Sequence, residues 1–363
     1  MLEQLRRYWK LILGGAAALA VVVTFVVANS GSDEPAPSAD ATPTTSPAAG
    51  ESVAPPTPSD SGAGDGAPVE PASRNPLTGQ PLDSPSFQQV VAVRVGNGDS
   101  ERPQTGLGQA GLVVETLLEG GETRFVAFYF GEQPTVVGPV RSLRPVDAAI
   151  VAPFEPLFVF SGGQDFVYRL VRAAAIDVID EGDTQALRRT DGVPPHNLVF
   201  DFAAGMSRAT GGPPAVDPIP VGGEWSATGE SADTIGFTLG TRFIEYSYDE
   251  DLGYVRRQDG ADFDVIGDDG PEPFVRDTVV IQFVAERSAG YSDAAGAEVP
   301  DFDVVGFGAA LAFHRGEMVE LTWRRGAQGS GTLLFSVDGA AFDLPTGRII
   351  IDLLPVGTQV TFE

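Results

Sequence analysis

The segment of residues 11–28 places the strongest constraint on how this chain can fold, because it is an uninterrupted run of apolar and small side chains. As an α-helix at 1.5 Å rise per residue it would span roughly 27 Å, which just covers the hydrocarbon core of a bilayer. Three basic residues precede the run within residues 1–10, and Asp33 and Glu34 follow it closely. The positive-inside rule therefore predicts a single-pass transmembrane signal-anchor with a cytoplasmic N-terminus and an extracytoplasmic remainder.

A cleaved signal peptide is the alternative for the same segment, because Ala28, Asn29 and Ser30 form a small-x-small cleavage pattern. A run this long is more typical of an anchor that is retained. Residues 29–73 then consist almost entirely of Pro, Ala, Ser, Thr, Gly, Asp and Glu, with no basic residue. Such a composition cannot bury a core, so we predict a disordered linker that gives the folded part, residues 74–363, its reach from the membrane.

The charge of the chain and its lack of cysteine exclude several classes of function. The formal net charge is −27, whereas nucleic-acid binding needs clustered Lys and Arg to replace counterions. With no cysteine and only two histidines, His196 and His314, we expect no disulfide, no thiolate chemistry and no multi-histidine zinc site. We therefore predict no nucleic-acid partner, no metal and no cofactor, and a fold that rests on its hydrophobic core alone.

The apolar pattern after residue 74 predicts two domains of different class. Residues 74–215 alternate strand-like and helix-like segments, which indicates a mixed α/β domain with at least one βαβ crossover. Residues 224–363 contain short strand-like segments between Gly and Asp turns, which favours a β-rich sandwich or barrel. The Gly- and Pro-rich stretch 211–223 is the predicted inter-domain linker, and the overall class is α+β. Strands are predicted at 89–95, 112–118, 124–130, 157–160, 176–179, 242–248, 254–257, 278–284, 310–314, 319–323, 333–337 and 348–353, and helices at 145–153, 164–174 and 201–210.

Residues 112–130 are predicted to form a hairpin that turns at the two glycines 120–121, since glycine tolerates the positive φ angles of two-residue turns. In that register Glu115, Glu119 and Arg124 fall on one face among apolar residues. A charge in such a place must be paired or must bind something. The two interpretations are a structural ion pair of Arg124 with Glu115 or Glu119, and a ligand site that uses these residues.

The segment 138–145 (GPVRSLRP) predicts a site for an anion. Pro145 suits the first position of a helix, so the polar side chains before it lie beside free backbone N–H groups. The turn 161–163 (SGG) repeats this geometry, and we expect both turns to meet because strand-to-helix turns gather at the carboxyl ends of strands in α/β sheets. Salt bridging in an acid-rich protein is the structural alternative. The candidate ligand contacts here are Arg141, Ser142, Arg144, Ser161, Gly162 and Gly163.

His196 lies on the loop 191–197 (DGVPPHN), and functional residues concentrate on loops. It could be a general base oriented by Asp191, or it could cap the helix that begins near Asp201. We expect it at the edge of the anion site, with Asn197 as a further candidate ligand contact. No serine-nucleophile, P-loop or zinc-protease motif accompanies this loop.

Several short motifs follow one another in order along residues 74–363. They are NPLTGQPL at 75–82, RPQTGL at 102–107, EGGETRF at 119–125, GPVRSLRP at 138–145, SGG at 161–163, PHN at 195–197, GEMVELTWRR at 316–325, FSVDG at 335–339 and LLPVG at 353–357. In this order they resemble the two-part YerB-like lipoprotein family, domain of unknown function 3048. The resemblance implies an extracytoplasmic role and supplies no established activity. The chain departs from the lipoprotein pattern because it has no cysteine to lipidate, so a protein helix would replace the lipid anchor.

Two functions remain open at this point. The main hypothesis is a membrane-tethered binding or assembly module of the cell envelope, with an Arg-lined cleft for an envelope protein or for an anionic or glycan ligand. The alternative is an envelope enzyme acting on a polyanionic or glycan substrate, with His196 as general base and the arginines as charge stabilisers. The enzyme requires His196 to face Arg141 across a cleft, and the binding module does not. Neither the ligand nor the oligomeric state follows from the sequence.

Overall fold

The computed structural model describes residues 74–82, 87–174, 176–225, 229–293, 295–326 and 331–363, together with Ala20 and Val21. The latter two form β1 (Ala20–Val21), which pairs antiparallel with β27 (Val360–Phe362). The predicted cytoplasmic segment 1–10, the linker 29–73 and the rest of the predicted anchor 11–28 lie outside the described residues. Within the described residues, no helix combines the length and the apolar character that crossing a bilayer requires.

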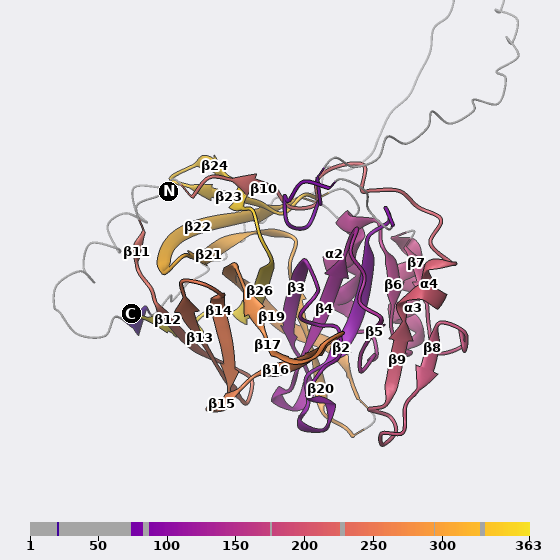
Figure 1. The fold of residues 1–363 in the computed structure, drawn as a ribbon. Coiled ribbons are helices and arrows are strands. Elements are labelled where there is room, and N and C mark those ends of the chain that lie inside the picture. The colour runs from indigo at the N-terminus through magenta and orange to yellow at the C-terminus, as the bar shows by residue number, and fades with distance from the viewer. Residues whose placement is uncertain are drawn as a thin grey trace, which may run out of the picture. The chain divides into compact units, whose positions relative to one another are not determined.

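A mixed sheet of thirteen strands organises the described part of the chain (Figure 1). Its main order is β24 (Ala340–Phe342), β23 (Leu334–Val337), β22 (Glu317–Arg325), β21 (Gly306–His314), β19 (Thr278–Ser292), β26 (Ile349–Pro355), β3 (Leu112–Leu117), β4 (Thr123–Tyr129), β2 (Val91–Gly96), β6 (Leu157–Val159) and β7 (Asp177–Ile179). Two further strands pair beside this path, β11 (Glu230–Ser231) with β22 and β20 (Glu298–Asp303) with β19. The sheet is parallel from β19 through β26 to β3, and again from β2 through β6 to β7.

The helices lie in the first half of the described chain. α3 (Asp165–Ala173) connects β6 to β7, and these strands are parallel neighbours, which confirms the predicted βαβ crossover. Its buried side chains Val167 and Val171 are four residues apart and so share one face. α2 (Pro145–Val151) runs into the short 3-10 helix η3 (Ala152–Phe154). The helix predicted at 201–210 is shorter in the structure and comprises only α4 (Phe202–Met206).

Smaller sheets pack beside the large one. A seven-stranded antiparallel sheet contains β1 and β27 with β12 (Thr234–Leu239), β13 (Arg242–Asp249), β14 (Gly253–Gln258), β15 (Ala261–Asp262) and β18 (Val275–Arg276). A three-stranded sheet contains β5 (Val136–Val137), β9 (Leu198–Asp201) and β8 (Leu187–Arg189). Two further pairs are the hairpin of β16 (Asp264–Gly267) with β17 (Gly270–Pro273) and the parallel pair of β10 (Val221–Gly223) with β25 (Leu344–Pro345). The remaining 3-10 turns are η1 (Asp99–Glu101) and η2 (Glu119–Gly121).

The central strands of the large sheet are buried on both faces, and successive side chains of a strand point to opposite sides. In β3, Val113 belongs to the core cluster shared with the smaller sheets, whereas Val114 belongs to the cluster shared with α2 and α3. This explains the near-continuous apolar runs of the central strands. β22 shows the predicted alternation, with Leu321 and Trp323 buried and Thr322 between them exposed.

The two parts predicted at 74–215 and 224–363 contribute strands to the same sheet. β26, from the second part, lies between β19 of the second part and β3 of the first, with Asp352 opposite Glu115. Beyond residue 224 the described elements are strands, in agreement with a β-rich second part. The described residues from Arg74 to Glu363 cluster in one compact unit. Side chains from the two parts can therefore meet inside one core.

Candidate functional site

The two turns predicted to converge are joined by hydrogen bonds. The Ser161 N–H donates to the Arg141 carbonyl at 3.0 Å, and the Leu143 N–H donates to the Gly162 carbonyl at 2.9 Å. The Ser142 hydroxyl donates to the Ser161 carbonyl, also at 3.0 Å. Segment 141–144 therefore lies beside the turn at the end of β6. Gly162 takes a φ of 87°, which favours glycine at this turn.

Four arginines gather where these turns meet, and three carboxylates accompany them. Each of the three acids pairs with one arginine: Glu101 Oε1 lies 2.6 Å from Arg141 Nε, Glu119 Oε2 lies 2.8 Å from Arg144 Nε, and Asp147 Oδ2 lies 3.3 Å from Arg94 Nε. The fourth arginine is Arg124. The cluster thus contains one more guanidinium than carboxylates, although the whole chain carries a net charge of −27.

Of the four arginines in this cluster, Arg124 is the one without an ion pair among the described residues. It is 8% exposed, and the contact of its side chain is a hydrogen bond from Nη1 to the Ser142 carbonyl at 3.0 Å. Burial, together with the positive charges of Arg144, Arg94 and Arg141, lowers the pKa of Arg124 to about 9. A buried cation held beside other cations is unfavourable unless an anion balances it.

His196 stands at the edge of this cluster, but its partner is not the predicted one. His196 Nδ1 lies 3.0 Å from Glu101 Oε1, the same oxygen that contacts Arg141 Nε. Asp191 is exposed, and the prediction that it orients His196 is wrong because Glu101 occupies that role. Arg141 Nη1 also donates to the Pro195 carbonyl at 3.2 Å. His196 and Arg141 are therefore neighbours that contact the same carboxylate.

Glu101 fits beside β2 because residue 96 is glycine. A Cβ atom at Gly96 would lie 2.3 Å from Glu101 Oε2, which is too close for any side chain. The Glu101 carboxylate also accepts the Gly98 N–H at 2.8 Å through Oε2. Arg141 and this backbone N–H hold the pKa of Glu101 below its usual value, against the opposing effect of its burial.

The predicted pair of Glu115 with Arg124 is wrong, because the hairpin register differs by one residue. The loop contains the 3-10 turn η2, and Glu115 lies opposite Phe125. A two-residue turn would have placed it opposite Val126. A slip of one residue moves a side chain to the other face of the sheet, so Glu115 and Arg124 point to opposite sides. Glu119 does pair with an arginine, but that arginine is Arg144.

Glu115 belongs to an internal ionic network and not to the arginine cluster. Its carboxylate accepts hydrogen bonds from Arg256 Nη1 at 2.7 Å and Arg256 Nη2 at 3.0 Å, and both side chains are fully buried. Asp352 lies next to Glu115 in the sheet and accepts the Tyr246 hydroxyl at 3.0 Å. This network joins the two parts of the chain through β3, β14 and β26.

Two further expectations about the site need correction. Asn197 is buried. Its side-chain N–H groups donate to the Thr190 and Gly192 carbonyls, and its side-chain oxygen accepts a hydrogen bond from Arg189, so it holds its own loop together. The N-terminus of α2 is not free, because Asp147 Oδ2 accepts the Arg144 N–H at 2.7 Å. The chain's own carboxylate thus takes the place that was predicted for a ligand.

Sequence reasoning missed three members of the site, namely Arg94, Glu101 and Asp147. Asp147 could have been found, because an acidic residue at the third position of a helix is a capping signal. Arg94 reads as part of an apolar strand, and Glu101 acquires its role only when β2 and the segment before α2 lie side by side. Among the described residues no group of three or more His, Asp or Glu side chains is placed to hold a metal ion.

The fold defines a class of two-part protein in which an α/β half and a strand-only half share one mixed sheet. The crystal structure of the YerB protein from Bacillus subtilis is similar to this chain, with a TM-score of 0.68 and 26% identity, covering 79% of this chain and 99% of that one. In sequence, the Bacillus subtilis (strain 168) protein named "Putative lipoprotein YerB" is 28% identical in an alignment of 295 residues that covers 77% of this chain and 86% of that protein.

Two family models match the chain, one in each half. "Protein of unknown function (DUF3048) N-terminal domain" matches residues 77–211, and "Protein of unknown function (DUF3048) C-terminal domain" matches residues 234–351. The chain therefore belongs to the DUF3048 family, which confirms the resemblance seen in its motifs.

Proposed function

We propose that this protein is a binding module of the cell envelope, tethered to the membrane, that holds an anionic or polar ligand in the cleft around Arg124. The observation that carries this proposal is the unpaired Arg124 guanidinium, buried among three other arginines. An anion that contacts Arg124 balances the excess positive charge. Two N–H groups of one guanidinium can donate in parallel to a phosphate or a carboxylate, which adds geometric specificity.

The neighbouring groups support a ligand with oxygen atoms in more than one direction. The Ser142 hydroxyl, Arg141 and the turn at Gly162 line the same place, and each is held by hydrogen bonds that fix its position. Arg94, which donates two hydrogen bonds to the Thr116 hydroxyl, is fully buried. Its charge would act strongly on a ligand, because the protein interior screens electrostatic interactions less than water does. A phosphorylated or carboxylated polymer of the envelope has the required chemistry.

Replacing Arg124 with methionine is expected to abolish stabilisation by phosphate. In the wild-type chain, purified at full length in detergent, phosphate at about ten times its Kd adds about 1.4 kcal/mol to the free energy of unfolding. The melting temperature then rises by a few degrees and saturates. Without phosphate, the variant is expected to be at least as stable as the wild type, because a desolvated charge has been removed.

The matched control is Arg188→Met, which removes an arginine whose side chain is 49% exposed. This variant should respond to phosphate as the wild type does. Equal rises in melting temperature for the wild type and for Arg124→Met would show only general stabilisation by salt, and the binding proposal would then be wrong.

The tether that we propose is the chain's own segment 11–28, in the orientation with the N-terminus cytoplasmic. The family relative is named a lipoprotein, but this chain contains no cysteine that could carry a lipid. A hydrophobic helix would supply the same attachment, and the linker 29–73 would hold the folded part away from the membrane.

Protease added to intact cells is expected to degrade the folded part, while the protein stays in the membrane fraction after extraction with high salt. The experiment uses an antibody against the folded part and a cytoplasmic protein as the control for cell integrity. Recovery of a soluble form that begins near Asn29 would support the cleaved signal peptide instead. Full protection from protease would contradict the extracytoplasmic orientation.

An envelope enzyme is the second candidate, and the contact between His196 and Glu101 favours it. A carboxylate within hydrogen-bond distance of one imidazole nitrogen orients the ring and selects its tautomer, which leaves the other nitrogen to act as a base. Arg141, in contact with the same carboxylate, would stabilise negative charge on the substrate. The two candidates differ in the fate of the ligand, which a binding module releases unchanged and an enzyme cleaves in a manner that depends on His196.

A further inference from the structure

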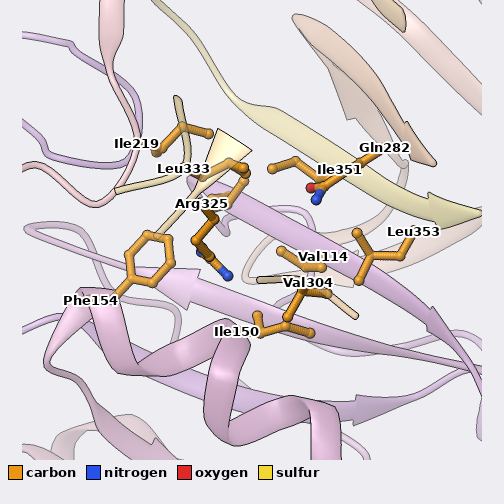
Figure 2. A pocket seen from close by; sticks show the side chains of 11 residues that line it. Val114, Ile150, Phe154, Ile219, Gln282, Val304, Arg325, Leu333, Ile351 and Leu353 are labelled. Carbon is orange, nitrogen blue, oxygen red and sulfur yellow. The ribbon is translucent and has the colours of Figure 1, made fainter. Parts of the chain in front are cut away.

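A second arginine, Arg325, is buried far from acidic side chains at the opposite end of α2. It is the last residue of β22 and is 7% exposed. Figure 2 shows its side chain extending between Phe154 and Ile150 into a pocket with apolar walls. The Arg124 cleft lies at the beginning of α2, so the two arginines belong to different places in the fold.

The contacts of Arg325 leave its charge uncompensated. Nη1 donates to the Ala149 carbonyl at 3.2 Å, in the last turn of α2, where the helix dipole offers only a partial negative charge. Nε is buried and has no hydrogen-bond partner. No ion pair involves Arg325 in the described part of the chain. Burial alone lowers the pKa of Arg325 to about 10.

The pocket beside Arg325 is small and contains one other polar side chain, Gln282. Its volume is about 20 Å³, which is enough for a single water-sized or chloride-sized occupant. Gln282 is 2% exposed, and both its amide and the Arg325 guanidinium belong to the pocket lining (Figure 2). The rest of the wall is aliphatic or aromatic, including Ile219, Leu333 and Val304.

We propose that this pocket binds one small monovalent anion, a halide. Both polar groups of the lining can donate hydrogen bonds, and no carboxylate of the described chain competes for them. A water molecule could satisfy Nε but would leave the charge unbalanced, whereas a monovalent anion does both. A multiply charged anion such as phosphate is too large and too strongly hydrated for an apolar pocket of this volume.

The pocket also explains what the anion would do for the fold. Its lining comes from the α2–η3 segment, from β3 and β26 in the centre of the sheet, and from Ile219 in the stretch between the two family halves. An anion on Arg325 would therefore hold together elements of both halves. The inference is independent of the Arg124 proposal, because the two sites share no residue and select different anions.

The test is a series of thermal unfolding measurements on the full-length chain in detergent, at constant ionic strength. Sodium gluconate, whose anion is too large for the pocket, is replaced stepwise by chloride or by bromide. The melting temperature of the wild type is expected to rise by a few degrees and to saturate with at least one of these anions.

Arg325→Met is expected to lose this response, and the neighbouring Arg324→Met, which changes an exposed residue, is expected to retain it. If Arg325→Met does not fold, Gln282→Leu provides a second variant with a weakened response, and anomalous scattering from bromide-soaked wild-type crystals shows directly whether an ion sits at Arg325. Equal responses in the wild type and Arg325→Met, or an empty pocket in the bromide crystals, would overturn the proposal.

Discussion

Arg256→Leu is expected to lower the free energy of unfolding by about 3–5 kcal/mol, which is the usual loss when one partner of a buried ion pair is removed. The Arg256 guanidinium is fully buried and donates to Glu115 Oε2 at 2.7 Å, while Asp352 lies beside both. Without the arginine, the Glu115 carboxylate remains in the core with only neutral donors. Because Glu115 and Arg256 belong to different halves of the chain, the loss should affect the unfolding of both halves together.

The matched control is Arg257→Leu, one residue further along β14. Arg257 points to the other side of the strand, its side chain is 45% exposed, and its partner Asp262 is 83% exposed. This change should alter the free energy of unfolding by no more than about 0.5 kcal/mol. Urea unfolding followed by circular dichroism measures both variants. Similar values for Arg256→Leu and Arg257→Leu would mean that the buried network contributes little.

The second large effect is a dependence of stability on pH that comes from Asp352. Burial and the adjacent Glu115 carboxylate raise the pKa of Asp352 well above its usual value, and the opposing attraction of Arg256 does not cancel this. In the pH range between the ordinary aspartate pKa and the raised value, the folded chain holds a proton that the unfolded chain has released. The stability contributed by this group therefore falls as pH rises, by up to about 1.4 kcal/mol per pH unit.

Asp352→Asn is expected to remove this part of the pH dependence. The amide keeps the shape of the protonated acid and can still accept the Tyr246 hydroxyl. The variant should be close to the wild type in stability at low pH and should exceed it increasingly as pH rises through the interval. Urea unfolding at a series of pH values gives the free energy of unfolding as a function of pH for each protein. Other titrating groups contribute equally to both curves, so the difference between the curves reports on Asp352. Asp262→Asn, at an exposed site, is the control, and parallel curves for Asp352→Asn and the wild type would contradict the prediction.

The secondary structure shows where sequence reasoning was sufficient. Each predicted strand of the folded part overlaps a strand of the structure, because apolar runs of this length and composition favour extended backbone wherever they can be buried. The βαβ crossover of β6, α3 and β7 followed from the change of period between strand and helix. Segment 141–144 does meet the turn at Gly162, but not for the predicted reason, because β5 and β6 lie in different sheets.

The hairpin after β3 shows how a small local error changes the chemistry. The two glycines did indicate the turn, and both take positive φ angles. The length of the loop was not determined by those glycines, and one extra residue moved Arg124 from the face of Glu115 to the face of Arg94. An error of one residue in the register of a strand has this effect because every side chain of the strand then moves to the opposite face of the sheet.

By itself, the sequence determined the order and type of the main elements and the family. These features depend on local periodicity, glycine and proline positions, and short motifs, all of which are present in the linear chain. Only the tertiary structure decided the partners of the buried charges. Glu115 and Arg256 are 141 positions apart, and a charge in a low-dielectric core is stabilised by whichever opposite charge the sheet order places within hydrogen-bond distance. The sheet order is a property of the whole core, so Arg256, Asp352 and the unpaired Arg124 acquired their roles only when the two halves packed into one unit.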